Sequence, residues 1–307
     1  MSDEWRGHVA MLAFSGLIAG SFALGSLAAP HIAPAALNAL RFGAAAVLLG
    51  GWAFARGSVA RSDFAAPWRY MLLGALMACY FVLMFEALKI APAVSLSAVF
   101  TLSPILSGIA GYVLMRQIMT RRMAAALAVG AAGALWVIFR ADLAMLLDFR
   151  IGRGEMIFFW GCAAHAVYTP LVRRLNRGQS PVTFSFGTIA AAALILISLG
   201  ARDLATMDWG AMPVIVWITL AYITIVATAL TIVLLQYASL RLPSAKVMAY
   251  TYLLPSWVIC WQAALGNPLP PVQVLAGVAL TIAALLILLK NEEGRRPALQ
   301  KGRNLSE

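Results

Sequence analysis

The sequence has little charge. Asp, Glu, Lys and Arg together make up 11% of its 307 residues, whereas hydrophobic residues make up 62%. A soluble domain is roughly 45–50% apolar and about 25% charged, and a soluble chain of this length could not bury so much apolar surface. The mean hydropathy of +0.86 points the same way. The composition therefore predicts an integral membrane protein.

The chain also has few groups for bond-making chemistry. It contains three cysteines, three histidines and twelve acidic residues, without the spacing of a zinc or redox motif. The predicted membrane interior offers His165 as its one histidine, no pair of acids for magnesium and no phosphate-cradling loop. These absences argue against an intramembrane enzyme and against ATP drive within the chain. No cofactor and no metal are expected.

The net charge of +11 would suit a nucleic-acid binder. The basic residues, however, occupy short gaps between long apolar runs, which is typical of the ends of membrane helices. We therefore expect a lipid bilayer and a small-molecule substrate as partners, and no nucleic acid.

A spanning helix needs about 20 mostly apolar residues. Ten windows of this kind are present, which predicts an all-α integral membrane protein with ten transmembrane helices. They are residues 8–28, 36–55, 70–88, 94–115, 123–139, 154–172, 181–200, 212–236, 246–264 and 272–289.

The positive-inside rule predicts the orientation. With both termini in the cytoplasm, 17 of the 23 Lys and Arg residues lie on the inner side and six on the outer side. Residues 291–307 then form a cytoplasmic tail. The excess of Arg over Lys and the abundance of Ala suggest a bacterial genome, so the expected location is the bacterial inner membrane.

The sequence shows an internal repeat when it is aligned with itself at an offset of 151 residues. Pro92 then aligns with Pro243, and Pro104 with Pro255. We expect a first five-helix repeat over 1–145 and a second over 152–290. Since five spans are an odd number, the second repeat is inverted, an architecture typical of secondary transporters with a site between the halves.

Several short stretches resemble a known family. They are Ala91-Pro92-Ala93 leading to Leu102-Ser103-Pro104, their echo from Leu242-Pro243-Ser244 to Leu253-Leu254-Pro255, Arg41-Phe42, and Gly154 through Trp160-Gly161 to Arg173-Arg174. Together with ten helices in two halves, they resemble the drug/metabolite transporter superfamily, EamA type. Within that family the chain is most similar to bacterial aromatic amino-acid exporters.

The resemblance implies an exporter of aromatic amino acids, with flat cationic drugs as further substrates. Many family members carry a Gly-Glu pair at the inner end of helix 4 and the outer end of helix 9. This chain has Met115-Arg116 and Gly266-Asn267 there, so no role of that glutamate is transferred. A five-plus-five chain can be complete by itself, and a monomer is expected.

Ionisable groups in a bilayer are costly and are candidates for function. Arg41 and Glu86 lie near the outer ends of their helices and could form an ion pair between helices 2 and 3. This pair would be an outer gate or, as the favoured interpretation, a structural contact. Lys246 begins helix 9, where it could attract a carboxylate or extend to the headgroups.

Apart from Lys246 at the start of helix 9, the predicted substrate-binding residues are aromatic or only weakly polar and lie away from the interfaces. Mid-membrane tyrosines must satisfy their hydroxyls, and rings around a cavity would suit a flat or cationic substrate. Pro104 and Pro255 are expected to kink their helices. The predicted set is Tyr80, Ser97, Thr101, Trp160, His165, Tyr168, Tyr222, Lys246, Met248 and Tyr252.

Other interpretations stay open. The chain could export nucleosides or carboxylates, or it could be a membrane assembly protein that transports nothing. A facilitator and a proton-linked exchanger both fit, with Glu86 and His165 as the evident proton carriers.

Overall fold

A computed structural model describes residues 3–116, 120–148, 151–239, 241–242, 247 and 249–289. Within these ranges the chain is helical and has no strand. Helices suit a membrane because each satisfies its own backbone hydrogen bonds without water. Lys246, Met248 and the tail 291–307 lie outside the described residues.

The helices follow one another with short connections. They are α1 (Asp3–Ala28), α2 (Pro34–Ala55), η1 (Arg61–Phe64), α3 (Trp68–Leu88), α4 (Ala93–Phe100), α5 (Ser103–Met115), α6 (Arg121–Ile138), α7 (Leu143–Leu147), α8 (Arg153–Leu175), α9 (Pro181–Thr206), α10 (Val214–Ala221), the π-helix η2 (Tyr222–Leu230), α11 (Thr231–Ser239), the 3₁₀ helix η3 (Tyr250–Leu253), α13 (Leu254–Ala264) and α14 (Val274–Leu289).

Three of the predicted windows are not one continuous α-helix. The window 94–115 holds α4 and α5 with a break at Thr101 and Leu102, and the window 212–236 contains the π-helix η2. In the window 246–264, α13 is preceded by a 3₁₀ turn. Pro104 and Pro255 stand in the first turn of α5 and α13, where the missing N–H is tolerated but continuation of the preceding helix is not.

Five helical stretches are long and apolar enough to cross a membrane: Asp3–Ala28, Pro34–Ala55, Trp68–Leu88, Ala93–Met115 with its break, and Pro181–Thr206. Three shorter helical stretches, Met123–Ile138, Val214–Leu230 and Val274–Leu289, are also apolar. The chain is thus multi-pass, and the count of ten spans stays a prediction.

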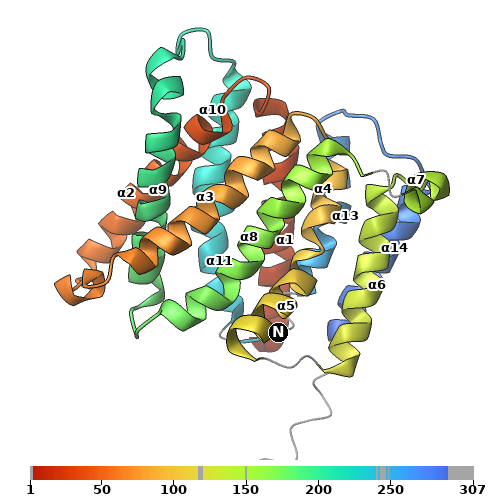
Figure 1. The fold of residues 1–307 in the computed structure, drawn as a ribbon, viewed down its shortest axis with the longest axis horizontal. Coiled ribbons are helices and arrows are strands. Elements are labelled where there is room, and N and C mark those ends of the chain that lie inside the picture. Colours follow the sequence, from red (N-terminus) through yellow and green to blue (C-terminus); the bar gives the residue numbers. More distant parts are fainter. Residues whose placement is uncertain are drawn as a thin grey trace, which may run out of the picture.

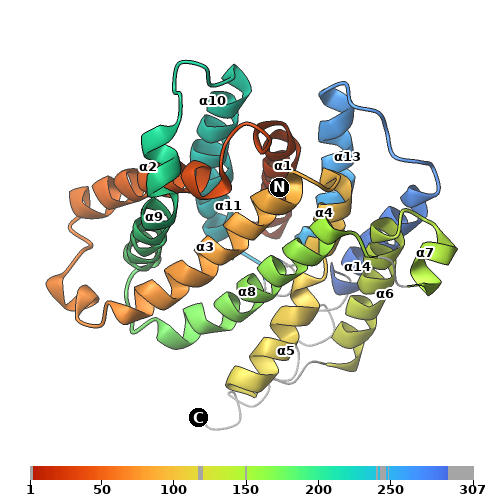
Figure 2. The same cartoon turned by 45° about the horizontal axis from the view of Figure 1, so that its top comes forward.

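The helices form one bundle with α1 and α8 near its centre (Figure 1). At one edge α2 packs on α9, and at the opposite edge α6 packs on α14. The second view keeps these pairs side by side, with the short α7 beyond α6 (Figure 2). The middle of the bundle is therefore where segments from both parts of the sequence meet.

The helix contacts occur in corresponding sets. The pairing of α3 with α8 has its counterpart in α11 with α1, and α5 with α8 corresponds to α13 with α1. Exchange of the two sequence halves converts each of these contacts into the other.

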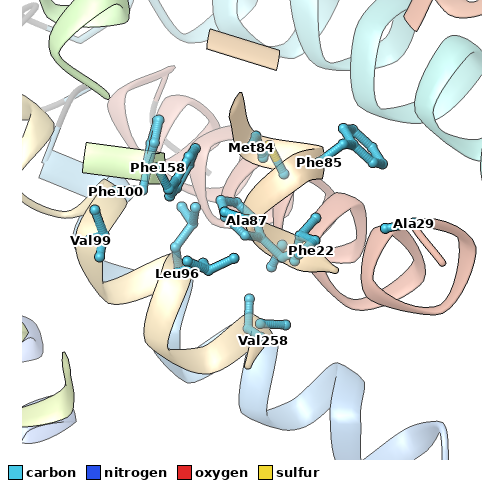
Figure 3. Close-up of a cluster of buried hydrophobic side chains, with 14 of the residues drawn as sticks. Phe22, Ala29, Met84, Phe85, Ala87, Leu96, Val99, Phe100, Phe158 and Val258 are labelled. Atoms are coloured by element: carbon cyan, nitrogen blue, oxygen red, sulfur yellow. The ribbon is translucent and has the colours of Figure 1, made fainter. Parts of the chain in front are cut away.

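The largest group of buried side chains lies where α1, α3, α4, α8 and α13 converge (Figure 3). It includes Phe22, Phe85, Leu96, Phe158 and Val258, all at most 1% exposed. In a bilayer such packing stabilises through van der Waals contact rather than escape from water, so close fit decides which helices associate.

Candidate functional site

Five rings gather at one side of this core, and we call them the aromatic–histidine cluster: Tyr80, Phe100 and Phe158, which belong to the core, with His165 and Tyr168. The His165 ring centroid lies 4.8 Å from Tyr80, 5.7 Å from Phe100 and 5.9 Å from Tyr168, with the Tyr168 ring stacked at 24°. Tyr80 also contacts Phe100 at 5.9 Å and Phe158 at 5.7 Å. Figure 3 shows Phe100 and Phe158 at the edge of the packed core.

Helical spacing places this cluster. Phe158, His165 and Tyr168 stand seven and three residues apart on α8, so they share one face of that helix. Gly161 on α8 lets α3 approach closely, because a Cβ there would lie 3.2 Å from the carbonyl oxygen of Tyr80. The cluster thus joins α3 and α4 of the first sequence half to α8 of the second.

His165 carries an unsatisfied polar atom. Its Nδ1 is buried and has no hydrogen-bond partner among the described residues. Buried polar atoms are normally paired, so such an orphan marks a place for a water or a ligand group. Among aromatic faces, a neutral ring nitrogen could receive or donate one hydrogen bond to a polar substrate group.

Arg41 lies deeper than the sequence suggests, and its expected ion pair with Glu86 is absent. Glu86 instead binds Lys89 one turn along α3, with Nζ 3.0 Å from Oε2. Arg41 is 4% exposed and donates to Thr228 Oγ1 from Nε at 3.2 Å and Nη2 at 3.1 Å. Pairing with a near neighbour at the helix end spares Glu86 the desolvation that burial beside Arg41 would require.

The Arg41 guanidinium also stacks on Phe81, with its Cζ 4.1 Å from the ring centroid. Phe81 contacts Tyr80 edge-on at 4.6 Å. A continuous row of contacts therefore leads from Arg41 through Phe81 and Tyr80 to His165.

Ser97 and Thr101 are fully buried in α4 and its terminal turn. Their hydroxyls bind their own helix, Ser97 to Val94 O at 2.7 Å and Thr101 to Ala98 O at 2.7 Å. Each hydroxyl keeps acceptor capacity, since its single proton is already donated. Thr101 follows Phe100 directly and so lies beside the aromatic–histidine cluster.

Tyr222 lies in η2 and belongs to a different set of contacts, which η2 and α13 make with α1. Its hydroxyl donates to Leu17 O at 2.7 Å, while Trp257 Nε1 donates to Ser15 Oγ at 3.0 Å and Trp261 Nε1 to Gly16 O at 2.9 Å. These bonds attach η2 and α13 to α1. Their geometry describes helix packing, which differs from the substrate role expected for Tyr222.

Tyr252 is fully buried in a second apolar cluster and packs against Gly130 of α6. Its hydroxyl has no partner among the described residues. Trp160, in contrast, is 62% exposed, so the expectation that it lines a cavity was wrong. Met156, one turn earlier on the same face of α8, is 42% exposed as well, so this face of the helix lies on the protein surface.

Sequence reasoning missed Phe81, Phe158, Thr228 and Glu155. The phenylalanines and Thr228 carried no distinguishing signal in an apolar run. Glu155, in the first turn of α8, is 4% exposed and accepts a hydrogen bond from Ser95 Oγ at 2.7 Å.

A cavity of about 460 Å³ opens at the end of the bundle away from the N-terminus of α1. It is lined by the ends of α1, α4, α6, α13 and α14, and its polar members include Ser26, Ser95, Gln262 and Asn267. On α4 the lining consists of Ala93, Val94 and Ser95, in the first turn of the helix that ends at Phe100.

Comparison with known proteins identifies the family. The model of the EamA-like transporter family matches residues 5–139 and 152–289, which is most of the chain. The chain belongs to the EamA-like transporter family. This EamA-family protein is therefore a multi-pass membrane transporter and not an enzyme.

One curated protein and one solved structure are similar to the EamA-family protein over most of its length. The uncharacterized transporter YyaM of Bacillus subtilis (strain 168) is 24% identical over 280 residues, covering 91% of this chain and 92% of that protein. A solved crystal structure with 20% sequence identity has a TM-score of 0.65 and covers 95% of this chain and 99% of that one. This second likeness concerns the fold alone.

Proposed function

We propose that the protein exports small metabolites, aromatic amino acids first among them, by alternating access between two inverted five-helix halves. The observation that carries the proposal is the aromatic–histidine cluster, in which rings from α3 and α4 meet rings from α8 around the unpaired His165 Nδ1. A flat ring can stack on Tyr80 and Tyr168 while its polar group reaches the imidazole.

The corresponding helix contacts support two related halves, 1–145 and 152–290. Exchange of the halves relates α3–α8 to α11–α1, and the two segments matched by the family, 5–139 and 152–289, fall one in each half. Rocking of the halves would expose the cluster to each side in turn, as in other transporters built from inverted repeats.

The end cavity would be the outer mouth of the pathway. It lies at the end of α1 opposite the N-terminus, and both termini are proposed to be cytoplasmic in a bacterial inner membrane. Substrate released from the cluster toward this cavity leaves the cell, which is the direction of export.

In this proposal Tyr80 and Tyr168 contact the substrate ring, with His165, Thr101 and Ser97 beside its polar group. Lys246 at the inner start of helix 9 and Met248 on the cavity wall stay predictions, because both lie outside the described residues. The protein works as a monomer. Because Glu86 already pairs with Lys89, His165 is the remaining candidate for proton coupling, with a facilitator as the alternative.

Counterflow in proteoliposomes tests this function, with labelled phenylalanine and tryptophan and with empty liposomes as the baseline. We expect saturable flux that unlabelled aromatic amino acids abolish. His165→Ala should lower it about tenfold, corresponding to roughly 1.4 kcal/mol of binding.

The matched control is Tyr222→Phe, which changes an aromatic residue of the α1 contacts and not of the cluster. It should leave the substrate preference unchanged. Absence of phenylalanine and tryptophan flux in the wild type would overturn the assignment of aromatic amino acids as substrates. If only nucleosides competed with the labelled flux, nucleosides would replace aromatic amino acids as the proposed substrate class.

A further inference from the structure

Arg41 is a buried cation that has no anionic partner among the residues that the structure describes. It is the eighth residue of α2, about 10 Å along the helix from its start at 1.5 Å per residue. Nine of the twelve acidic residues lie in the described part of the chain, and the other three follow residue 290. Among those nine only Glu155 is buried, and it binds Ser95.

The hydrogen bonds of Arg41 leave one edge of its guanidinium open. Nε and Nη2 both donate to Thr228 Oγ1, while Nη1 is buried and has no partner among the described residues. Thr228 donates its own proton to Ile223 O at 2.7 Å, so it can only accept from Arg41. The Nη1–Nη2 edge is the fork that binds a carboxylate through two parallel hydrogen bonds.

Arg69 provides an internal comparison, because it is equally buried at 1% exposed. Its guanidinium donates to the carbonyl oxygens of Leu175 at 2.6 Å, Ala66 at 3.3 Å and Asp63 at 3.4 Å. A buried arginine that only supports the fold is thus satisfied by backbone carbonyls in this protein. Arg41 has no such acceptor for Nη1.

The surroundings of Arg41 suit a ligand that binds reversibly. Thr228 lies in the π-helix η2, and π-helical turns occur frequently at functional sites. Phe81 covers one face of the guanidinium and contacts Tyr80 of the aromatic–histidine cluster. A carboxylate at Nη1 would therefore lie next to rings able to hold an aromatic group.

We propose that the Nη1–Nη2 edge of Arg41 binds the carboxylate of the transported molecule, so that the substrates are carboxylates. The proposal rests on the proposed export function and narrows its substrate class. It accounts for a guanidinium that has neither an anionic partner nor an acceptor for Nη1 among the described residues, in an apolar interior where an uncompensated charge is costly. It also disfavours flat cations, which the same guanidinium would repel.

Ligand binding to the purified full-length protein tests this, measured as the shift in thermal unfolding temperature. Each carboxylate is compared with its neutral amide: 3-phenylpropionate with 3-phenylpropanamide, and hexanoate with hexanamide. We expect the wild type to bind at least one carboxylate tenfold or more tightly than its amide. The wild-type protein alone can therefore refute the proposal. It does so if it binds the acid and the amide of each pair equally, or if it binds neither carboxylate.

Arg41→Gln should abolish the preference for the carboxylate, and Arg41→Lys, which keeps the charge but lacks the fork, should retain part of it. The control Arg69→Lys should keep the full preference. If Arg41→Gln kept the wild-type preference, the carboxylate would bind elsewhere.

The outcome is separable from that of the proposed function. Saturable phenylalanine flux with equal binding of acid and amide would refute the role of Arg41 alone. A preference for carboxylates that depends on Arg41, without phenylalanine flux, would refute the amino-acid assignment alone.

Discussion

Gly133 of α6 and Gly277 of α14 lie backbone against backbone. A Cβ built on either glycine would be 2.6 Å from the carbonyl oxygen of the other. Reciprocal contact of this kind lets two membrane helices approach through backbone atoms, as small residues at helix interfaces do. The pair fixes the edge of the bundle next to the end cavity, whose lining includes Val137 and Val274 of the same helices.

Gly277→Ala is therefore expected to destabilise the protein by about 1–3 kcal/mol, the usual cost of overpacking, because a carbonyl oxygen cannot move aside like a side chain. Thermal unfolding in detergent measures the loss. Gly43→Ala in α2 is the control, since a Cβ there meets nothing within 4 Å. Equal unfolding temperatures for the two variants would contradict the close contact.

Tyr252→Phe should leave the protein as stable as the wild type or more so. The buried hydroxyl lacks a partner among the described residues, and its removal relieves an unsatisfied group worth about 1–3 kcal/mol. Tyr222→Phe should instead cost about 0.5–1.5 kcal/mol, an ordinary hydrogen bond, because it loses the bond to Leu17 O. A loss of stability in Tyr252→Phe would show that its hydroxyl has a partner.

Arg69→Met should lower the free energy of unfolding by about 1–3 kcal/mol, because carbonyl oxygens that now accept from the guanidinium lose their donor. The control is the exposed Arg56, whose Cζ lies 5.0 Å from the ring centroid of Trp52. Arg56→Met should change stability by no more than about 0.5 kcal/mol. Denaturant or thermal unfolding of both variants decides whether Arg69 supports the fold.

Trp160→Ala should keep transport within about twofold of the wild type per folded molecule, as expected for a residue on the outer surface. The indole is 62% exposed and lies outside the aromatic–histidine cluster. Counterflow normalised to the amount of folded protein measures this. A loss as large as that of His165→Ala would mean that the face of α8 bearing Trp160 turns inward during transport.

Arg41 illustrates how far the candidate site could be predicted. An arginine inside an apolar run is visible in the sequence as a functional candidate. Its partner Thr228 is 187 residues away and is an unremarkable residue in another apolar run. The shared position near the outer ends of helices 2 and 3 suggested Glu86 as the partner, but Glu86 pairs with Lys89 at the end of its own helix.

The sequence by itself determined that the chain is helical and embedded in a membrane, because uniformly apolar runs cannot remain in water and must satisfy their backbone hydrogen bonds internally. Only the tertiary structure decided that His165 faces the protein and Trp160, five residues earlier on α8, faces outward. In a soluble helix the alternation of apolar and polar residues would have distinguished the two faces. Here both lipid and protein interior are apolar, so packing between helices alone selects the residues that surround the site.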